Sequence, residues 1–430
     1  MNRRLALWIG LGALLVARVA SAQDVTIGYQ GLPYKATGES NTGIQLSDGL
    51  LLHTGIGVEA GYDTNVFYAN TNPEGSAILR VMPFLELTNA TRTGPVSRDV
   101  SLDARFGLQY RHYFSNAMDI QPYRDAWMPN GGVSVALGGG GQFGFGFADV
   151  FARIEDPPYQ VQLNNNLGPL TRDNNQASVE GRWSPGGGRL VSLLRFTNMV
   201  DIYEQSSGYN YANAMTNTLT LDVAWKWLPK TAVFLDVQQG YVDYLDTTAT
   251  KFSSYPLRIT TGLRGLLTSK TSAVLSLGYV NGFYGGPGGS TGGFLHSTFA
   301  ELALTIQLTQ LSRAVVGFRH DFLNEVISSF GYDDTVYVSY VQQIAGRLGL
   351  DLSGRFAHIA YGGTFVDVAQ EGRADNFFQV GATLDYFLRN WAYLGVGYSL
   401  LDSTSSGPSP TIVDDDYLKQ QVFARLGITY

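Results

Sequence analysis

One pattern recurs along most of the chain: segments of about ten residues in which apolar side chains alternate with polar or small ones. In residues 100–111, Val, Leu, Ala, Phe, Leu and Tyr occupy one parity, and Ser, Asp, Arg, Gly, Gln and Arg the other. Successive side chains of a strand point to opposite faces, so such a segment has one apolar and one polar face. Segments 52–63 and 421–430 follow the same rule. The pattern predicts strands that face hydrocarbon on one side and water on the other.

Applied to the whole chain, this pattern predicts roughly eighteen strands. We expect them near 51–63, 77–88, 99–112, 132–138, 142–153, 176–183, 190–203, 217–228, 231–242, 257–267, 272–280, 298–308, 314–322, 335–342, 347–360, 376–387, 392–400 and 417–430. Short turns follow the even strands and long polar loops follow the odd ones. The predicted fold is all-β: a transmembrane antiparallel up-and-down β-barrel of about 18 strands, with short periplasmic turns and long extracellular loops. Within it, Pro83 predicts a local bulge, because proline removes a ladder donor.

Residues 1–22 have the features of a secretory signal peptide: Arg3 and Arg4, an apolar run over 5–17, and small residues at 20–22. We therefore expect a signal peptide at 1–22, a periplasmic N-terminal segment at 23–50 and the barrel at 51–430. Removing the signal lowers Lys plus Arg from 29 to 26, against 36 acidic residues. This acidic balance argues against nucleic acid as a partner.

The composition narrows the chemistry further. The chain has no Cys and only five His, so we expect no disulfide, no metal site and no cofactor. No apolar run of 18 residues follows the N-terminus, which argues against a helical membrane protein.

Aromatic residues provide an independent test, because Trp and Tyr collect at membrane interfaces. We expect one girdle beside the short turns and one at the loop ends: Trp183, Trp225, Trp227, Tyr386, Trp391 and Tyr430, and Tyr62, Tyr110, Tyr241, Tyr279 and Tyr361. A soluble all-β sandwich is the alternative, but it would place its aromatics in the core. The last strand, with Phe423, Ile428 and the terminal Tyr430, resembles the signal that directs outer-membrane barrels to their assembly machinery.

A barrel of this strand number leaves an aqueous channel, so its inward face matters for function. Acidic and basic residues alternate on that face, which favours neutral or weakly charged solutes; mutual charge satisfaction explains the pattern equally well. The predicted pore-lining residues are Glu59, Arg80, Glu86, Asp103, Arg105, Arg111, Glu180, Arg182, Arg195, Asp222, Lys226, Asp236, Arg258, Arg264, Glu301, Arg319, Asp321, Asp351, Arg355, Asp385 and Arg425. Inward aromatics at Tyr203, Tyr337, Phe377, Tyr393 and Phe423 suit packing, or stacking on sugar rings.

An enzymatic role is not expected. His320 and His358 fall near the outer rim, but the sequence offers neither a serine elbow nor an evident polar partner for them. The acidic pair Asp333–Asp334 is expected to serve loop solubility. The first strand begins near residue 51, which leaves no room for an N-terminal plug domain.

Segments 61–67, 227–236 and 262–271 resemble the type 2 group of β-barrel porins. The mature chain also resembles the eighteen-stranded barrels of myxobacterial exopolysaccharide export. This resemblance implies an outer-membrane exit for a polysaccharide, working with a periplasmic polysaccharide export protein.

Two functions follow as the main alternatives for this outer-membrane protein of a Gram-negative bacterium, which would lie among lipid and lipopolysaccharide. A structural or adhesive barrel, whose loops bind outside partners, is a weaker third. A polysaccharide export channel predicts a wide lumen with few inward-folded loops. A general diffusion porin for small hydrophilic solutes predicts an inward loop, for which 154–175 is the best candidate, although its stretch 162–166 is uncharged. We expect export.

Overall fold

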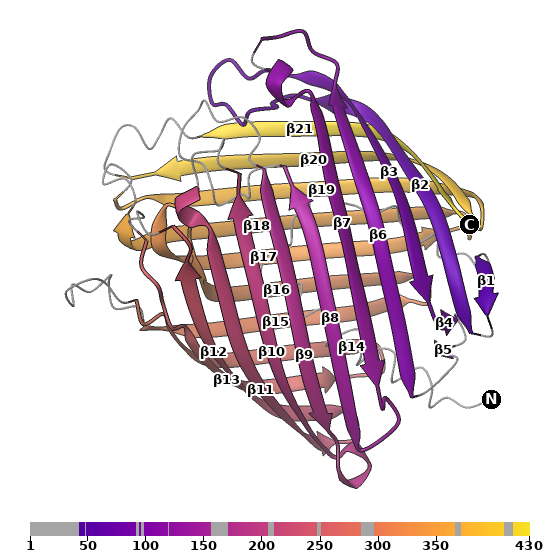
Figure 1. Cartoon of the computed structure of the whole chain (residues 1–430), viewed down its shortest axis with the longest axis vertical. Helices are drawn as coiled ribbons and strands as arrows, with labels where there is room; N and C mark the ends of the chain where they lie inside the picture. Colours follow the sequence, from indigo (N-terminus) through magenta and orange to yellow (C-terminus); the bar gives the residue numbers. More distant parts are fainter. Residues whose placement is uncertain are drawn as a thin grey trace.

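The computed structural model describes residues 43–47, 49–91, 94–95, 99–118, 120–155, 171–204, 210–246, 251–284, 296–365, 371–407 and 416–430. Eighteen long strands, each hydrogen-bonded to its neighbours in chain order, form its wall (Figure 1). They are β2 (Leu50–Asp63), β3 (Ser76–Thr88), β6 (Val100–Tyr113), β7 (Asp125–Leu137), β8 (Phe143–Ile154), β9 (Arg172–Trp183), β10 (Leu190–Tyr203), β11 (Ala214–Leu228), β12 (Thr231–Tyr244), β13 (Leu257–Leu266), β14 (Thr271–Asn281), β15 (His296–Thr309), β16 (Ser312–Asn324), β17 (Ser328–Ile344), β18 (Leu348–Phe365), β19 (Ala374–Arg389), β20 (Ala392–Ser406) and β21 (Tyr417–Thr429).

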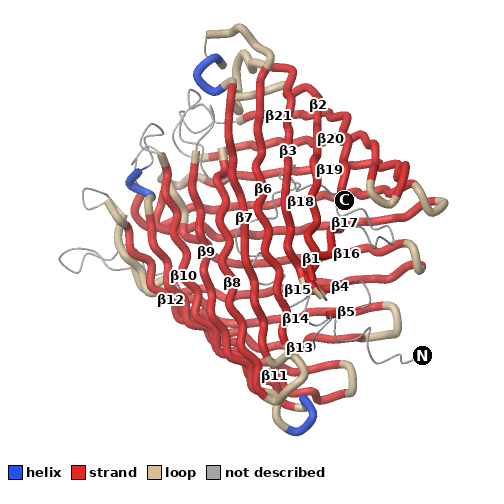
Figure 2. Tube along the Cα trace, turned by 45° about the vertical axis from the view of Figure 1, so that its right-hand side comes forward, coloured by secondary structure: helices blue, strands red, loops and turns tan. Residues whose placement is uncertain are grey.

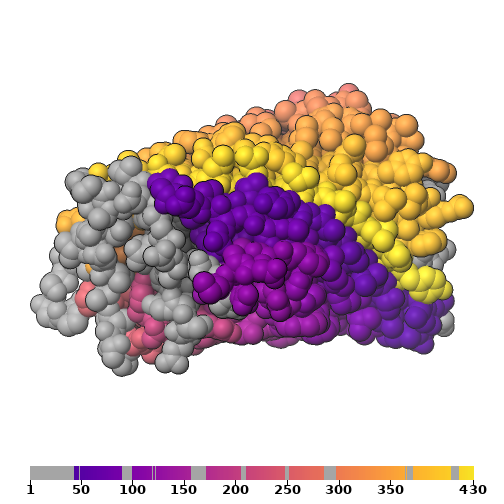
Figure 3. Space-filling model, turned by 90° about the horizontal axis from the view of Figure 1, so that it is seen from above, coloured from indigo at the N-terminus to yellow at the C-terminus, as the bar shows by residue number. Residues whose placement is uncertain are grey.

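The sheet closes on itself. β2 pairs with β3 on one side and with β21 on the other, in antiparallel register from Gly55↔Thr429 to Asp63↔Gln421. In Figure 3 the yellow C-terminal strand accordingly borders the indigo N-terminal one. Closure satisfies the backbone hydrogen bonds without leaving a sheet edge, as a strand-built membrane protein requires. The predicted fold class is confirmed.

The outer face of the wall is apolar. Phe106, Leu194, Leu302 and Val422 are all exposed, at parities opposite to those of the charged residues on the same strands. Trp183, Trp225, Trp227, Trp391 and Tyr430 are exposed beside the short turns, as predicted. A closed antiparallel barrel with an apolar outer wall belongs in the outer membrane of a Gram-negative bacterium.

Small elements lie outside this wall. β1 (Ile44–Ser47) pairs with the start of β2, and β4 (Ala90–Thr91) and β5 (Gly94–Pro95) form a short hairpin at a turn. Three 3₁₀ turns, η1 (Gln121–Tyr123), η2 (Gly186–Gly188) and η4 (Asn210–Ala212), sit in connections (Figure 2). Among the residues that the structure describes, no helix has the length and apolar composition needed to cross a membrane.

Four expectations need correction. The ladder of β3 to β6 skips Met82 and Pro83 but keeps its register on both sides, so proline interrupts the hydrogen bonds without a bulge. β7 begins at residue 125, not 132, because β6 pairs with residues 125–131 although these do not alternate between apolar and polar side chains. Tyr361 does not belong to the outer girdle: it is buried, and its hydroxyl donates to Asp375. Asp333 and Asp334 lie within β17 and not in a loop.

Residues 1–42 lie outside the described part of the chain. The signal peptide and most of the N-terminal segment therefore stay predictions. The same holds for most of loop 154–175, including 162–166.

Candidate functional site: the barrel interior

Every predicted pore-lining residue lies on the strand parity opposite to the exposed apolar side chains of its strand, except that Leu228, beyond the register shift at the end of β11, is exposed on the parity of Asp222 and Lys226. On β3, Arg80 and Glu86 are buried while Leu85 is exposed; on β21, Phe423 is buried while Val422 is exposed. The alternation of the sequence therefore places these charges inside the barrel, where their partners decide what the wall offers a solute.

Ion pairs join many of the inward charges. Arg80 lies 3.6 Å from Glu59, Arg195 lies 2.6 Å from Glu180, and Arg264 lies 2.6 Å from Asp222. Arg425 pairs with Asp385. The arginines thus have an opposite charge close by, and the net charge of the wall stays small.

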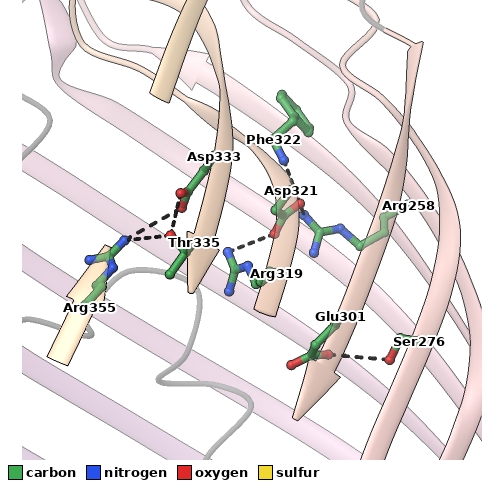
Figure 4. Close-up of polar contacts among 9 residues, drawn as sticks. All are labelled: Arg258, Ser276, Glu301, Arg319, Asp321, Phe322, Asp333, Thr335 and Arg355. Carbon is green, nitrogen blue, oxygen red and sulfur yellow. Dashed lines mark hydrogen bonds and ion pairs between the residues drawn. The ribbon is translucent and has the colours of Figure 1, made fainter. Parts of the chain in front are cut away.

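A second cluster lies across the six neighbouring strands from β13 to β18 (Figure 4). Arg258 and Arg319 converge on the buried Asp321, with N···O distances of 2.5 and 2.8 Å. Arg355 lies 3.8 Å from Asp333 and donates to Thr335 Oγ1. Ser276 donates to Glu301, the remaining acid of the cluster.

Inward arginines also stack on inward aromatic rings. The guanidinium carbon lies 4.5 Å from the ring centroid for Arg80 over Phe423, 4.7 Å for Arg105 over Phe84, and 4.9 Å for Arg264 over Phe234. Such cation–π contacts hold the guanidinium flat against the wall. Of the predicted inward aromatics, Phe423 lies beneath Arg80, Tyr203 beneath Arg172 and Tyr393 beneath Arg425, which favours packing, one of the two interpretations.

Glycines make room for this layer. A Cβ on Gly317 would come within 2.2 Å of the Tyr337 ring, and one on Gly427 within 2.1 Å of the Tyr393 ring. A Cβ on Gly395 would lie 2.1 Å from Asp385 Oδ1 and 3.1 Å from Arg425 Nε. Gly395 of β20 is paired with both residues, so the ion pair spans the strand between them. Many glycines of the inner wall are thus required by close approach.

The extracellular end of the barrel is narrowed from within. Val66 and Ile120, from the connections after β2 and β6, pack with the inward side chains Ile78, Tyr113 and Phe423. Ile327, from the connection after β16, packs on Ala357, Ile359, Tyr361 and Phe377 in the same way. Inward loop packing, which the porin alternative expected of 154–175, therefore occurs in other loops.

One loop contact crosses several strands. Lys251, after β12, donates from Nζ to the carbonyl oxygens of Glu325 and Ser328, after β16. Burial lowers the pKa of Lys251 to about 7, partly opposed by the negative charge of Glu325. Burial likewise raises the pKa of Glu325 well above its usual value. The two carboxylate oxygens of Glu325 are buried and accept no hydrogen bond from any residue that the structure describes. This contact between Lys251 and the 325–328 turn is called the latch below.

Sequence analysis predicted Arg111 but missed its partner Glu155, and it missed both members of two further interior pairs. Lys419 lies 3.0 Å from Asp63, Arg111 lies 3.0 Å from Glu155, and Arg373 lies 2.8 Å from Asp375. These residues sit at the outer strand ends or in loops, where alternation is weak. Of the remaining predicted residues, Arg182 donates to Ser184, Asp236 accepts from Gln238, and Asp103, Lys226 and Asp351 lie on the inner face. Within the described residues, no three metal-ligating side chains gather.

No family model matches the chain, and no curated protein matches it in sequence. The likeness to the type 2 porins and to myxobacterial export barrels therefore stays a prediction. Among solved structures, the chain is similar to OpdK of Pseudomonas aeruginosa, crystallised with vanillate, with 11% identity, a TM-score of 0.47, and coverage of 88% of this chain and 99% of that one. It is also similar to OccAB4 of Acinetobacter baumannii, with 10% identity, a TM-score of 0.43, and coverage of 88% of this chain and 98% of that one. For the siderophore receptor PirA of A. baumannii the identity is 9% and the TM-score 0.43, with coverage of 90% of this chain and 81% of that one.

Proposed function

We propose that this outer-membrane barrel is a channel for hydrophilic solutes of little net charge, with saccharides as the main class. The observation that carries the proposal is charge compensation on the inner wall, where arginines lie between carboxylates and aromatic rings. A wall of one sign would attract counter-ions and select by charge. A compensated wall offers many hydrogen-bonding groups and little net charge, which suits the hydroxyl groups of sugars.

Within this class, we propose that the solute is a secreted polysaccharide that leaves the cell together with a periplasmic polysaccharide export protein. The sequence resemblance supports this direction of transport. The exposure of Ile44 and Leu46 of β1 at the short-turn rim, 45% and 53%, supports a contact with such a partner there. Exposed apolar side chains of this kind mark interaction surfaces.

A specific observation favours the second candidate, diffusion of small hydrophilic solutes. Val66, Ile120 and Ile327 occupy the outer end of the lumen. A polymer would have to displace these loops, whereas a small solute passes beside them.

A clean deletion, complemented with the same gene, separates the two functions. Loss of surface polysaccharide with unchanged uptake of small sugars is expected for export. Normal polysaccharide with slowed uptake would instead identify a diffusion porin. If neither changes, the channel proposal is wrong.

Charge compensation is tested directly on the purified barrel in planar bilayers. Arg264→Gln leaves Asp222 without its pair and should shift the reversal potential in a KCl gradient toward cation selectivity. Arg347→Gln makes the same charge change on an exposed turn and serves as the control. Equal reversal potentials for the two variants would contradict the proposed role of the paired wall.

A further inference from the structure

β15 and β16 separate before they reach the outer rim. Their ladder ends at Ala300↔His320, whereas β16 stays paired with β17 as far as Asn324↔Phe330. Beyond that point Phe322 and Phe330 pack against Phe299, whose side chain belongs to the inner face of β15. The β16–β17 hairpin therefore lies on the inner side of the end of β15, with its outer-face side chains packed against the inner face of that strand. The inner-face residue Ser297 of β15 is thereby brought to the outer-face residue His320 of β16.

The hydroxyl, the imidazole and a carboxylate form a continuous series at this junction. Ser297 Oγ lies 3.4 Å from His320 Nε2, and His320 Nδ1 lies 2.7 Å from Asp334 Oδ1. His320 and Asp334 are direct cross-strand partners. The Tyr332 ring lies nearly parallel to the imidazole, at 8° and 6.5 Å between centroids. The expectation that His320 has no polar partner was wrong, because its partners come from other strands.

Two other histidines on the outer face have a similar cross-strand acceptor. His112 Nδ1 lies 2.7 Å from Asp125 Oδ1, and His358 Nδ1 lies 2.8 Å from Asn376 Oδ1. Within the described chain, only His320 also contacts a serine hydroxyl through its second ring nitrogen. This difference makes the other two histidines natural controls.

The position of the junction indicates what it meets. His320 and Asp334 each lie two residues beyond exposed apolar side chains of the outer wall, Phe318 and Val336. Their own side chains keep 25% and 45% of their exposure. The site is therefore accessible at the edge of the apolar belt, where acyl chains meet polar head groups and where the extracellular mouth begins.

We propose that Ser297, His320 and Asp334 form a hydrolytic site for acyl esters, with a role separate from conduction. A nucleophile held by a base, which is oriented in turn by a carboxylate, is recognised by geometry and not by sequence order. The 3.4 Å contact is long for a hydrogen bond, and such contacts commonly tighten when substrate binds.

The reaction balances without any other reactant than water. Ser297 Oγ attacks the ester carbonyl and passes its proton to His320 Nε2, which returns it to the departing alkoxide as the alcohol leaves. Water then attacks the acyl-serine, His320 takes a proton from the water, and that proton returns to Oγ as the carboxylic acid is released. Asp334 stabilises the imidazolium that forms in both steps. The ester comes from a lipid acyl chain or from an O-acylated saccharide at the channel mouth.

The test uses the full mature chain in detergent micelles with p-nitrophenyl acetate and p-nitrophenyl palmitate. We expect hydrolysis above the micelle background. Ser297→Ala and His320→Ala should each lose on the order of 100-fold or more of this rate. Thr298→Ala and His358→Ala should keep it. The proposal would be overturned if the wild-type chain hydrolysed neither ester faster than micelles alone, or if Ser297→Ala kept the wild-type rate.

Labelling with a fluorophosphonate keeps the proposal testable where a variant fails to fold. The wild-type chain should be modified at Ser297, and Asp334→Asn should slow this modification; labelling at another serine alone would overturn the assignment. Release of fatty acid from phospholipid vesicles, or of acetate from an O-acetylated oligosaccharide, then distinguishes the two ester sources.

Discussion

Gly395→Ala tests whether the inner wall depends on close approach across β20. The introduced Cβ would lie 2.1 Å from Asp385 Oδ1 and 3.0 Å from the Leu384 carbonyl oxygen, so the carboxylate must move and its pair with Arg425 must open. Asp385 and Arg425 keep only 6% and 12% side-chain exposure, so water compensates poorly for the lost contact.

The magnitude follows from two opposing effects. Alanine normally stabilises a strand relative to glycine by about 0.5–1 kcal/mol, because the unfolded chain loses freedom. Overpacking a filled site costs about 1–3 kcal/mol, and removing one partner of a buried ion pair costs about 3–5 kcal/mol. Both partners remain here, so we expect Gly395→Ala to lower the free energy of unfolding by about 1–3 kcal/mol.

Equilibrium urea unfolding of the barrel in lipid vesicles, followed by tryptophan fluorescence, measures this change. Gly181→Ala is the matched control, because a Cβ there meets no atom within 4 Å. An Asp385→Ala background removes the 2.1 Å contact with the carboxylate, so Gly395→Ala should cost less there. The reasoning would be refuted by equal stabilities for Gly395→Ala and Gly181→Ala, or by an equal cost in both backgrounds.

Three further predictions concern the latch, the outer wall and the stacked arginines. The pKa of Lys251 in the folded chain, about 7, lies below its ordinary value of 10.5, so the unfolded chain binds more protons between these two pH values. Lys251 therefore makes the free energy of unfolding rise with pH across that window. The midpoints of urea unfolding should lose this rise in Lys251→Met, and an unchanged slope would contradict the burial of Lys251. Leu302→Arg, in the middle of the apolar wall, should cost about 2–4 kcal/mol in vesicle unfolding, and Leu308→Arg beside a turn about 0–1 kcal/mol; equal costs would contradict the placement of the membrane. Phe234→Leu should remove the cation–π contact with Arg264 and so lower the free energy of unfolding by about 0.5–2 kcal/mol more than the same change does in an Arg264→Gln background. Equal effects in the two backgrounds would argue against the stack.

Much of the wall could be predicted from the sequence, because strand alternation has a period of two and each strand crosses the same membrane. Predicted and observed bounds differ chiefly at the extracellular ends, as in β17, which begins at residue 328 and not at 335. There the residues at both parities of β17 are buried by other segments, and those at outer-face positions no longer face lipid. The alternation of apolar and polar side chains is therefore lost at this end of the strand.

The faces of the charged residues could also be predicted, but their partners could not. Arg264 of β13 pairs with Asp222 of β11, and Arg258 of β13 pairs with Asp321 of β16. These contacts skip strands and depend on the curvature and stagger of the closed wall, which alternation does not encode. The contact between Ser297 and His320 depends on where β15 leaves β16, and Phe299, Phe322 and Phe330 pack together at that point, which alternation does not encode.

The seam between the first and last strands has a consequence for assembly. β2 extends below its pairing with the C-terminal segment, whose last backbone hydrogen bonds join Thr54 and Tyr430. β1 folds back on Leu50, Leu51 and Leu52 along this overhang. The two seam strands lie at opposite ends of the barrel sequence, so the barrel can close only after the whole wall has been made. Until then β2 is an open edge to which another chain could add. The hairpin of β1 with the start of β2 is local in sequence and can therefore form early. It covers the part of the β2 edge that the last strand never reaches.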